Sequence, residues 1–330
     1  CVVTGTGNEA AQRHHYYGTF TEAQNIRTAE IRVGEGVKGF VTELWSTLPN
    51  IVTVSITSPS GERTGQIPVR LGYLFDFVFA FERTAVTVEY RLLQENSDAQ
   101  LVFIRLQKAV PGIWKIEVKP VMQPKGEFHM WLPMKEFLDG EVYFLESNPD
   151  TTFTEPAGGE HTMTVSYYNS QENTVDINSG RGYTRDERIK PDYAAPGVAV
   201  TGAVPGGGFK ERTGSSAATA IAAGGCTLIM KWISDQPGAG GASASQVRNV
   251  IVMGAQKLPA IEYPNTQWGY GNDELVSFTG YFKTAVKKNE IRRGYRWQIF
   301  LKNSAEEFQM LRVTSLRRQE IHWRFQKIKK

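Results

Sequence analysis

Apolar and polar residues alternate with a period of two from about Glu30 to Leu145. Because successive side chains of a strand point to opposite faces, this alternation predicts strands with one buried face. The segment Ser58-Pro59-Ser60-Gly61 has the composition of a tight turn between two of them. About eight or nine such short strands, without regularly spaced helices, predict an antiparallel β-sandwich or barrel. The clearest alternating stretches are Val52–Ile56, Val86–Leu92 and Trp114–Val118.

Residues 146–280 have a different pattern, in which apolar strands are mixed with helices. The segment Ser216–Trp232 is apolar on nearly every side, which predicts a helix that is buried all round. Ser243 or Ser245 is expected to cap a second helix with one apolar face. That face holds Val247, Val250 and Ile251, and the expected strands of this region are Met163–Tyr168 and Gly197–Val204.

Composition narrows the class of protein. The chain has 330 residues, of which 41% are apolar and 22% charged. It is therefore long and apolar enough for a sizeable core, which excludes a disordered chain, a collagen-like repeat and a small disulfide scaffold. Its only cysteines, Cys1 and Cys226, allow at most one disulfide and no cysteine-rich metal site.

Charge is distributed unevenly along the chain. Residues 281–330 carry 14 Lys and Arg against 4 Asp and Glu, although the net charge of the whole chain is only +3. Such a basic C-terminal extension on an acidic body is either a solvated segment or a surface for nucleic acid, an anionic surface or the body itself. No nucleic-acid-binding motif accompanies it, so we expect no nucleic-acid partner.

No membrane span or signal peptide is expected. The longest weakly polar run, Ala217–Met230, is shorter than a bilayer-crossing helix and contains two glycines. The sequence opens at Cys1 without a basic segment ahead of an apolar one. Because structure is expected from the first residues onward, we expect a further segment upstream.

Candidate chemistry lies just before the apolar helix, in Gly214-Ser215-Ser216-Ala217-Ala218. A serine at a helix N-terminus lies beside free N–H groups and the positive end of the helix, which favour developing negative charge. Small neighbours allow a substrate backbone to approach. On these five residues alone, ordinary N-capping followed by alanine packing is the simpler interpretation.

Three further segments occur in a fixed order around this serine. Thr6-Gly7-Asn8-Glu9 opens the chain, and Ser179-Gly180-Arg181-Gly182 precedes Lys190-Pro191-Asp192-Tyr193-Ala194-Ala195-Pro196-Gly197. A closing segment holds Tyr263-Pro264-Asn265 and Trp268-Gly269-Tyr270-Gly271. The ordered set resembles the subtilisin-like serine peptidases, or subtilases. A sandwich inserted after the asparagine segment is similar to the clostridial germination-protease branch, as is Ala220 where secreted subtilisins usually have Pro.

The resemblance implies a function and roles for individual residues. The parent protein would be a serine endopeptidase that acts on protein or peptide substrates, in which Ser216 forms the acyl-enzyme. Asn8 would donate to the oxyanion, together with the Ser216 backbone N–H. Gly5, Thr6 and Gly7 would form part of the wall that holds the residue before the cut bond. The resemblance also implies a bacterial protein that is secreted or spore-associated.

It further implies the fold and its domains. We expect an α/β fold, a subtilisin-like parallel sheet with helices on both faces, interrupted by an antiparallel jelly-roll-like sandwich. Residues 1–20 and 149–280 would form the C-terminal part of the peptidase domain. Residues 21–148 would form the insert, and 281–330 the basic extension.

The sequence departs from the family in its catalytic triad. Subtilases carry the triad in the order Asp, His, Ser, so the Asp and His are expected upstream of Asn8. Without that base the Ser216 hydroxyl stays protonated, and this chain alone is expected to be inactive. The five histidines are expected to be surface or structural residues, and none has the spacing of a zinc site. They are His14, His15, His129, His161 and His322.

No metal or cofactor is therefore assigned, although a structural calcium ion is a feature of many relatives.

Two other functions stay open. One is a catalytically inactive relative that acts as a regulatory scaffold. The other is a binding module in which Trp45, Trp114 and Trp131 bind a ligand, against the simpler interpretation of these rings as core aromatics.

Overall fold

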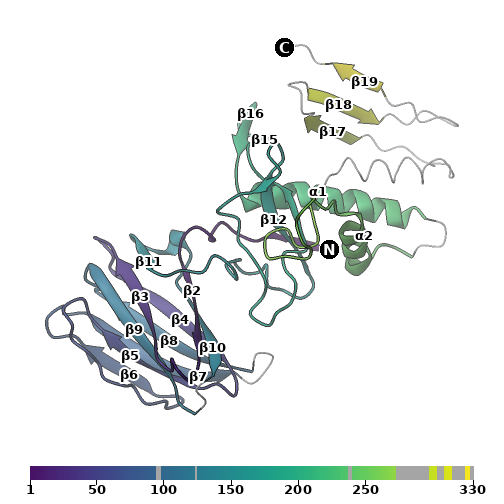
Figure 1. Cartoon of the computed structure of the whole chain (residues 1–330). Coiled ribbons are helices and arrows are strands. Elements are labelled where there is room, and N and C mark those ends of the chain that lie inside the picture. Colours follow the sequence, from purple (N-terminus) through teal and green to yellow (C-terminus); the bar gives the residue numbers. More distant parts are fainter. Residues whose placement is uncertain are drawn as a thin grey trace. The chain divides into compact units, whose positions relative to one another are not determined.

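The structure is a computed structural model that describes residues 1–93, 98–122, 125–236 and 240–272. It also describes the backbone of three later strands, β17 (Trp297–Lys302), β18 (Phe308–Val313) and β19 (Arg324–Lys327). The chain divides into two compact units (Figure 1). The first contains residues 1–170 and 174–273, and the second contains 171–173 and 274–330.

Two antiparallel sheets form a β-sandwich within the first unit (Figure 1). One sheet has six strands in the order β2-β10-β4-β8-β7-β6, and the other has four in the order β11-β3-β9-β5. The strands of the larger sheet are β2 (His15–Phe20), β4 (Gly39–Thr47), β6 (Leu74–Val78), β7 (Ala85–Leu93), β8 (Ala99–Gln107) and β10 (Gly126–Trp131). Those of the smaller sheet are β3 (Arg27–Val33), β5 (Val52–Thr57), β9 (Gly112–Pro120) and β11 (Val142–Phe144), and a short 3-10 helix, η1 (Lys135–Phe137), precedes β11.

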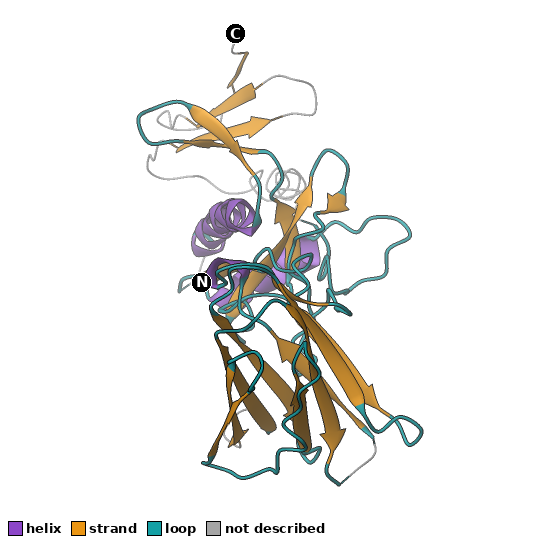
Figure 2. Cartoon of the chain, turned by 90° about the vertical axis from the view of Figure 1, so that its left-hand side faces the viewer, coloured by secondary structure: helices purple, strands orange, loops and turns teal. Residues whose placement is uncertain are grey.

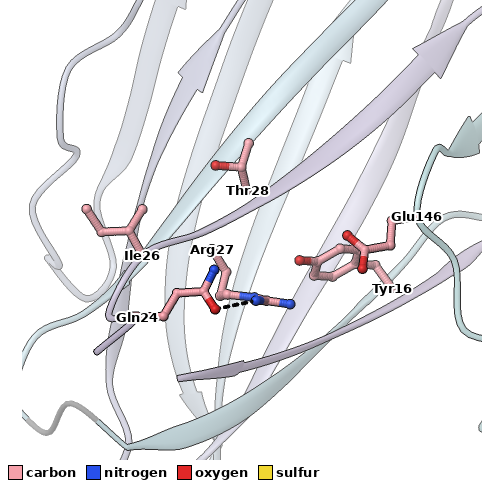
Figure 3. A pocket seen from close by; sticks show the side chains of 6 residues that line it. All are labelled: Tyr16, Gln24, Ile26, Arg27, Thr28 and Glu146. Carbon is pink, nitrogen blue, oxygen red and sulfur yellow. Dashed lines mark hydrogen bonds between the residues drawn. The ribbon is translucent and has the colours of Figure 1, made fainter. Parts of the chain in front are cut away.

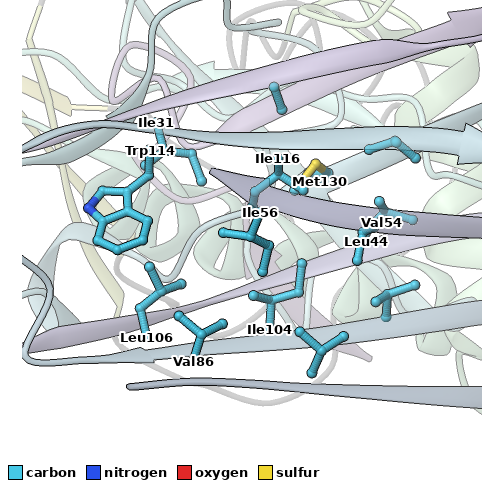
Figure 4. Close-up of a cluster of buried hydrophobic side chains, with 14 of the residues drawn as sticks. Ile31, Leu44, Val54, Ile56, Val86, Ile104, Leu106, Trp114, Ile116 and Met130 are labelled. Carbon is cyan, nitrogen blue, oxygen red and sulfur yellow. The ribbon is translucent and has the colours of Figure 1, made fainter. Parts of the chain in front are cut away.

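The core of the sandwich lies between its two sheets, as the alternation predicts. Val86, Val88 and Tyr90 of β7 are fully buried, while the residues between them face outward. Figure 4 shows such inward side chains from several strands packed in one layer, with Trp114 at one end of it. Full burial of one valine, leucine or isoleucine side chain stabilises a fold by about 1.5–3 kcal/mol. The continuous layer of such side chains gives the sandwich a hydrophobic core of its own.

The sandwich begins earlier than the sequence indicates. Strand β2 (His15–Phe20) pairs along its whole length with β10 in the larger sheet. The expected boundary at residue 20 had left this strand in the peptidase part, so the insert starts at His15 instead. The expected turn is present, because the Gly61 N–H donates to the Ser58 carbonyl (3.0 Å) and Gly61 has a φ of +94°.

A third sheet, which is mixed, has β12 (Thr162–Asn169) as its central strand. On one side β12 pairs in parallel with β1 (Val2–Gly5), and it also pairs in parallel with β14 (Tyr193–Pro196) and antiparallel with β13 (Thr174–Val175). Six consecutive residues of β12 are buried, from Met163 to Tyr168. A strand buried on two faces is typical of a parallel sheet covered by other elements. This is the α/β part of the predicted fold, and Figure 2 shows its helices in purple beside the sheet.

Helix α1 (Ser215–Ser234) packs against β1, β12 and β14. Only one of its faces is buried, the one that carries Ala218, Ala222, Cys226 and Ile229. The expectation of a helix buried all round is therefore wrong, because alanine and glycine on the other face tolerate exposure. By length and apolar composition α1 could cross a membrane, but a core helix packed on a sheet passes the same test.

The second helix, α2 (Ala244–Gly254), begins where the sequence predicts. Ser243 is its N-cap, and its hydroxyl accepts a hydrogen bond from the Gln246 N–H (3.2 Å). The Gln246 side chain in turn accepts from the Ser243 N–H (2.9 Å), which completes a capping box. Val247 and Ile251 are buried on the face that the spacing indicates.

One strand differs from its prediction. Of the expected strand Gly197–Val204, only Val200–Ala203 is a strand, β15, whereas the strand in the parallel sheet, β14 (Tyr193–Pro196), ends just before it. Strand β15 instead forms a hairpin with β16 (Phe209–Arg212). Pro191 precedes β14 and Pro196 is its last residue. Both lower the strand propensity of this segment, so the sequence favours the apolar residues after it.

The second unit contains one antiparallel three-stranded sheet in the order β17-β18-β19. These strands fall within the basic extension, residues 281–330. Its side chains lie outside the described residues. The expectation that no nucleic acid binds there therefore stays a prediction.

Candidate active site

Ser216 lies in the first turn of α1, directly after the N-cap residue Gly214 and the buried Ser215. Its side chain is exposed and makes no hydrogen bond to the residues that the structure describes. The backbone N–H groups in the first turn of a helix have no acceptor within the helix. Ser216 therefore presents a free hydroxyl beside a free N–H, at the positive end of a 20-residue helix.

Asn8 reaches this helix end from the loop that follows β1. The Ser215 N–H donates to Asn8 Oδ1 (3.1 Å). Since a backbone N–H can only donate, the atom facing it is the amide oxygen, and Nδ2 is left free to donate to a ligand. A Cβ on Gly214 would lie 3.3 Å from Asn8 Oδ1, so this glycine gives the amide room over the start of the helix.

Backbone hydrogen bonds on each side hold the loop that carries Asn8. The Thr6 N–H donates to the Val165 carbonyl (2.9 Å), and the Thr154 N–H donates to the Thr6 carbonyl (3.0 Å). Gly7 has a φ of +83°, and a Cβ there would lie only 2.6 Å from Thr154 Oγ1. Only glycine readily adopts this left-handed backbone, and only glycine leaves room for the Thr154 side chain so close to it.

The expected motif Ser179-Gly180-Arg181-Gly182 supports the same loop from behind. The Gly180 N–H donates to the Gly7 carbonyl (3.1 Å). A Cβ on Gly180 would come within 2.2 Å of the Thr6 carbonyl oxygen. The role of this glycine is thus to let two backbone segments touch behind the loop that carries Asn8.

A cavity of about 370 Å³ opens beside Ser216. Gly5 and Gly7, two of the three expected wall residues, line it, whereas the Thr6 side chain is buried and faces Ser179 (Oγ1 to Oγ, 3.5 Å). Thr154, Pro156 and Thr219 also line it and were not predicted. Thr219 follows Ser216 by three residues on the same helix face, a signal that the sequence did contain.

A second cavity, of about 300 Å³, lies on the sandwich and shares none of these residues (Figure 3). Arg27 crosses it and donates to Gln24 Oε1 (2.9 Å). Burial raises the pKa of Tyr16, which lines the same cavity. The cavity contains no nucleophile beside a base and has no connection to Ser216 in its lining.

The Lys190-Pro191-Asp192 motif builds structure in the sheet. Asp192 Oδ2 accepts from Lys190 Nζ (2.8 Å) and from the Thr164 N–H (2.7 Å), and all three groups are buried. Asp192 Oδ1 accepts from Arg248 Nε (2.5 Å) on α2. A buried carboxylate with this set of donors ties β14 to β12 and α2, and holds the sheet on which α1 rests.

Three of the four described histidines make contacts inside the structure, and the fourth, His161, lies on the surface. His14 pairs with Glu9, and His161 is exposed. His15 and His129 stack on Trp131 and share a hydrogen bond (2.9 Å). Burial, and to a lesser extent the neighbouring His129, lowers the pKa of His15 to about 3. Burial, and to a lesser extent the Arg185 guanidinium, lowers the pKa of His129 to about 4. None of these four reaches Ser216, and His322 lies outside the described residues.

The three tryptophans also make internal contacts. Trp114 is buried in the sandwich core. Trp131 is half-buried and donates from Nε1 to the Thr151 carbonyl (3.0 Å). The Arg185 guanidinium lies 5.5 Å from the centre of the Trp45 ring. Each of the three rings therefore has a contact within the described residues, and a ligand role for them stays a prediction.

Within the described residues, no three His, Cys, Asp or Glu side chains are grouped to hold a metal ion. Cys1 is exposed and Cys226 is buried, and neither forms a disulfide. The location of a structural calcium ion is therefore not assigned.

Comparison with known proteins finds similarity over parts of the chain. Residues 140–271, which include the Ser216 segment, match the subtilase family model. The fold is similar to that of the CspB protease of Clostridium perfringens, with a TM-score of 0.76 and 26% sequence identity. The match covers 85% of this chain and 60% of the CspB chain, so this chain spans little more than half of that protein. The residues outside the sandwich make up less than 85% of this chain, so the part that matches CspB must include much of the sandwich.

Two other solved structures resemble a smaller part of the chain. The patellamide maturation protease PatA matches with a TM-score of 0.34 and 20% identity over 41% of this chain and 48% of PatA. The prenylagaramide maturation protease PagA matches with a TM-score of 0.32 and 22% identity over 39% of this chain and 45% of PagA. No curated protein matches the chain. Residues 140–271 thus match the subtilase family model, and the fold of the chain is similar to that of the CspB protease.

Proposed function

We propose that the parent protein is a serine endopeptidase and that Ser216 is its nucleophile. The observation that carries this proposal is the hydrogen bond from the Ser215 N–H to Asn8 Oδ1 (3.1 Å). It turns the Asn8 amide so that Nδ2 and the Ser216 N–H are two free donors beside one hydroxyl. Two preorganised donors beside a nucleophile form an oxyanion hole, the arrangement that acyl transfer requires.

The proposed reaction follows from these positions. Ser216 Oγ attacks the peptide carbonyl carbon while its proton passes to a histidine base, and the carbonyl oxygen becomes an oxyanion. Asn8 Nδ2–H and the Ser216 N–H donate to that oxyanion, and the positive end of α1 stabilises it further. The C–N bond then breaks, the amine leaves with the proton, and water hydrolyses the acyl-enzyme on Ser216.

The base and its aspartate are proposed to lie upstream of this sequence. Subtilases place Asp and His before Ser in the chain. Among the described residues, no histidine approaches Ser216, so this part of the site supplies the nucleophile, the oxyanion donors and a pocket. The chain alone is expected to be inactive because a serine without a base is a weak nucleophile.

The cavity beside Ser216 is proposed to accept the substrate side chain that precedes the cut bond. Glycines and threonines form most of its lining, with Pro156 at one side, and no charged side chain of the described residues lines it. Gly5 and Gly7 leave the backbone open on that wall. The substrate is a protein or peptide chain, which the family also implies.

Peptide hydrolysis by the full-length protein tests the proposal. Ser216→Ala is expected to abolish hydrolysis. Asn8→Ala is expected to lower kcat by about 10²–10³ with little change in KM, as the loss of this donor does in subtilisin. If the folded wild-type protein hydrolyses no peptide from a diverse library, the protein is instead an inactive relative that acts as a scaffold.

A further inference from the structure

A buried acid and a buried histidine lie directly after the proposed oxyanion residue. Glu9 follows Asn8 in the chain, and its Oε2 accepts a hydrogen bond from His14 Nδ1 (2.7 Å). The side chains are only 10% and 9% exposed. A carboxylate this deeply buried is stable only with a partner, so the contact is a built feature of the loop.

The histidine end of this contact is fixed to the sandwich. The His14 carbonyl accepts from the Leu132 N–H (2.9 Å), directly after β10. One residue earlier, the Arg13 carbonyl accepts from the Phe144 N–H (3.0 Å) of β11. Strand β2 begins at the next residue, His15. His14 is therefore held by both sheets of the sandwich and extends its ring toward Glu9.

The other end of the contact adjoins the Asn8 loop. The Gln12 N–H donates to the Glu9 carbonyl (3.0 Å), and the Ala10 N–H donates to the Asn178 carbonyl (3.3 Å). Ahead of Asn8, Gly7 has a left-handed backbone and is held through it, by the hydrogen bond from the Gly180 N–H to the Gly7 carbonyl (3.1 Å). Asn8 itself is exposed, and its side chain makes one hydrogen bond to the residues that the structure describes, from the Ser215 N–H. Its position depends on the neighbours that anchor it.

We propose that Glu9 and His14 are positioning residues through which the sandwich holds Asn8 in the oxyanion hole. This inference rests on the proposed peptidase function. A donor must lie within about 0.5 Å of its productive place, and a misplacement of 1 Å lowers rates by roughly 10²-fold. The insert would then set the geometry of the catalytic site, beyond adding a separate module to the chain.

The test compares variants of the full-length protein in peptide hydrolysis. Glu9→Ala is expected to lower kcat by about 10- to 100-fold while KM changes less than about twofold, since the oxyanion contact is made in the transition state. Glu9→Gln keeps an acceptor for His14 Nδ1 and is expected to stay within about threefold of wild type. His14→Leu removes the donor at similar volume and is expected to resemble Glu9→Ala.

A double-mutant cycle separates positioning from general damage. In an Asn8→Ala background, Glu9→Ala is expected to have no further effect on kcat, because the residue it positions is already gone. The matched control is Glu117→Ala, which removes an acid from the Arg63–Glu117 ion pair (3.0 Å) elsewhere on the sandwich. It is expected to leave kcat unchanged. Thermal unfolding of every variant confirms that it is folded.

The outcomes distinguish the two proposals. Equal losses from Glu9→Ala with and without Asn8 would overturn the positioning role while the peptidase function stands. So would unchanged kcat in a folded Glu9→Ala variant. If Glu9→Ala does not fold, His14→Leu and its cycle with Asn8→Ala decide the question in the same way. A wild-type protein without hydrolysis overturns the peptidase function, and the positioning role falls with it.

Discussion

Gly5 is the residue at which a single added methyl group acts most directly on the proposed site. A Cβ at Gly5 would lie 2.5 Å from Thr219 Oγ1 and 3.0 Å from both Cβ and the carbonyl oxygen of Ser215. Ordinary contacts begin at 3.4 Å, so the Ser215 backbone must shift by a few tenths of an ångström. Thr219 cannot turn away freely, because its hydroxyl donates to the Ser215 carbonyl (2.7 Å).

Gly5→Ala is therefore expected to move the start of α1, where Ser216 lies. Overpacking of this kind lowers the free energy of unfolding by about 1–3 kcal/mol. Because a 1 Å misplacement lowers rates by about 10²-fold, a smaller shift is expected to lower kcat by roughly 3- to 10-fold. Chemical denaturation and peptide hydrolysis of the full-length variant measure the two effects.

Gly202→Ala is the matched control, since a Cβ there meets no atom within 4 Å and the backbone is not left-handed. It is expected to match wild type in both assays. Thr219→Ala removes the closest atom, so the Gly5→Ala and Thr219→Ala double variant should regain part of the lost stability. If Gly5→Ala behaves like Gly202→Ala, then β1 and α1 are not packed as closely as described and the reasoning is refuted.

Three further perturbations test other parts of the structure. Gly224→Ala, in the middle of α1 with open space around it, should raise the free energy of unfolding by about 0.5–1 kcal/mol in chemical denaturation; a decrease would mean that the helix is not exposed there. Asp192→Asn leaves the buried Lys190 ammonium without its anion and should lower that free energy by about 3–5 kcal/mol, and a loss below 1 kcal/mol would contradict a buried ion pair. The pKa values of His15 and His129 are lowered from 6.5 to about 3 and about 4, chiefly by burial, so below pH 6.5 the unfolded chain binds more protons than the folded one. Stability should therefore fall on acidification from pH 6.5 toward 4, and less steeply in His129→Gln, which is checked by denaturation across that range; equal slopes would show that the pKa of His129 is not lowered in the folded protein.

Local pattern predicted the elements that depend on neighbours in the sequence. The alternation at Val86–Leu92 is enough to place a half-buried strand, and the structure confirms it in β7. The Ser243 cap and the apolar spacing of Val247 and Ile251 likewise predicted α2. Such signals are contained within one or two turns of chain, where propensity and periodicity act.

Features that depend on distant partners were missed. Strand β2 joins the sandwich because β10 lies beside it, more than a hundred residues later in the chain. Thr154 and Pro156 line the cavity next to Ser216 because the chain returns from the sandwich at that point. No periodicity near these residues shows which segment they will meet. The side-chain pairs that close such contacts are visible only once the topology is known.

The candidate site was predicted by motif order rather than by periodicity. Asn8 and Ser216 are separated by two hundred residues, and only their resemblance to family segments connects them. The structure places Asn8 Oδ1 against the residue before Ser216. Glu9 belongs to the Thr6-Gly7-Asn8-Glu9 motif. Its pairing with His14 was not predicted, because the sequence of a polar loop does not show which residue will be buried against it.

Covalent labelling of Ser216 tests the central claim most directly. The full-length protein, as its source produces it, is treated with a fluorophosphonate probe, and the modified peptide is identified by mass spectrometry. The account predicts an adduct on Ser216 that is absent in Ser216→Ala and slower to form in Asn8→Ala. An adduct at another residue, or none on the folded full-length protein, would contradict the assignment of Ser216 as an active nucleophile.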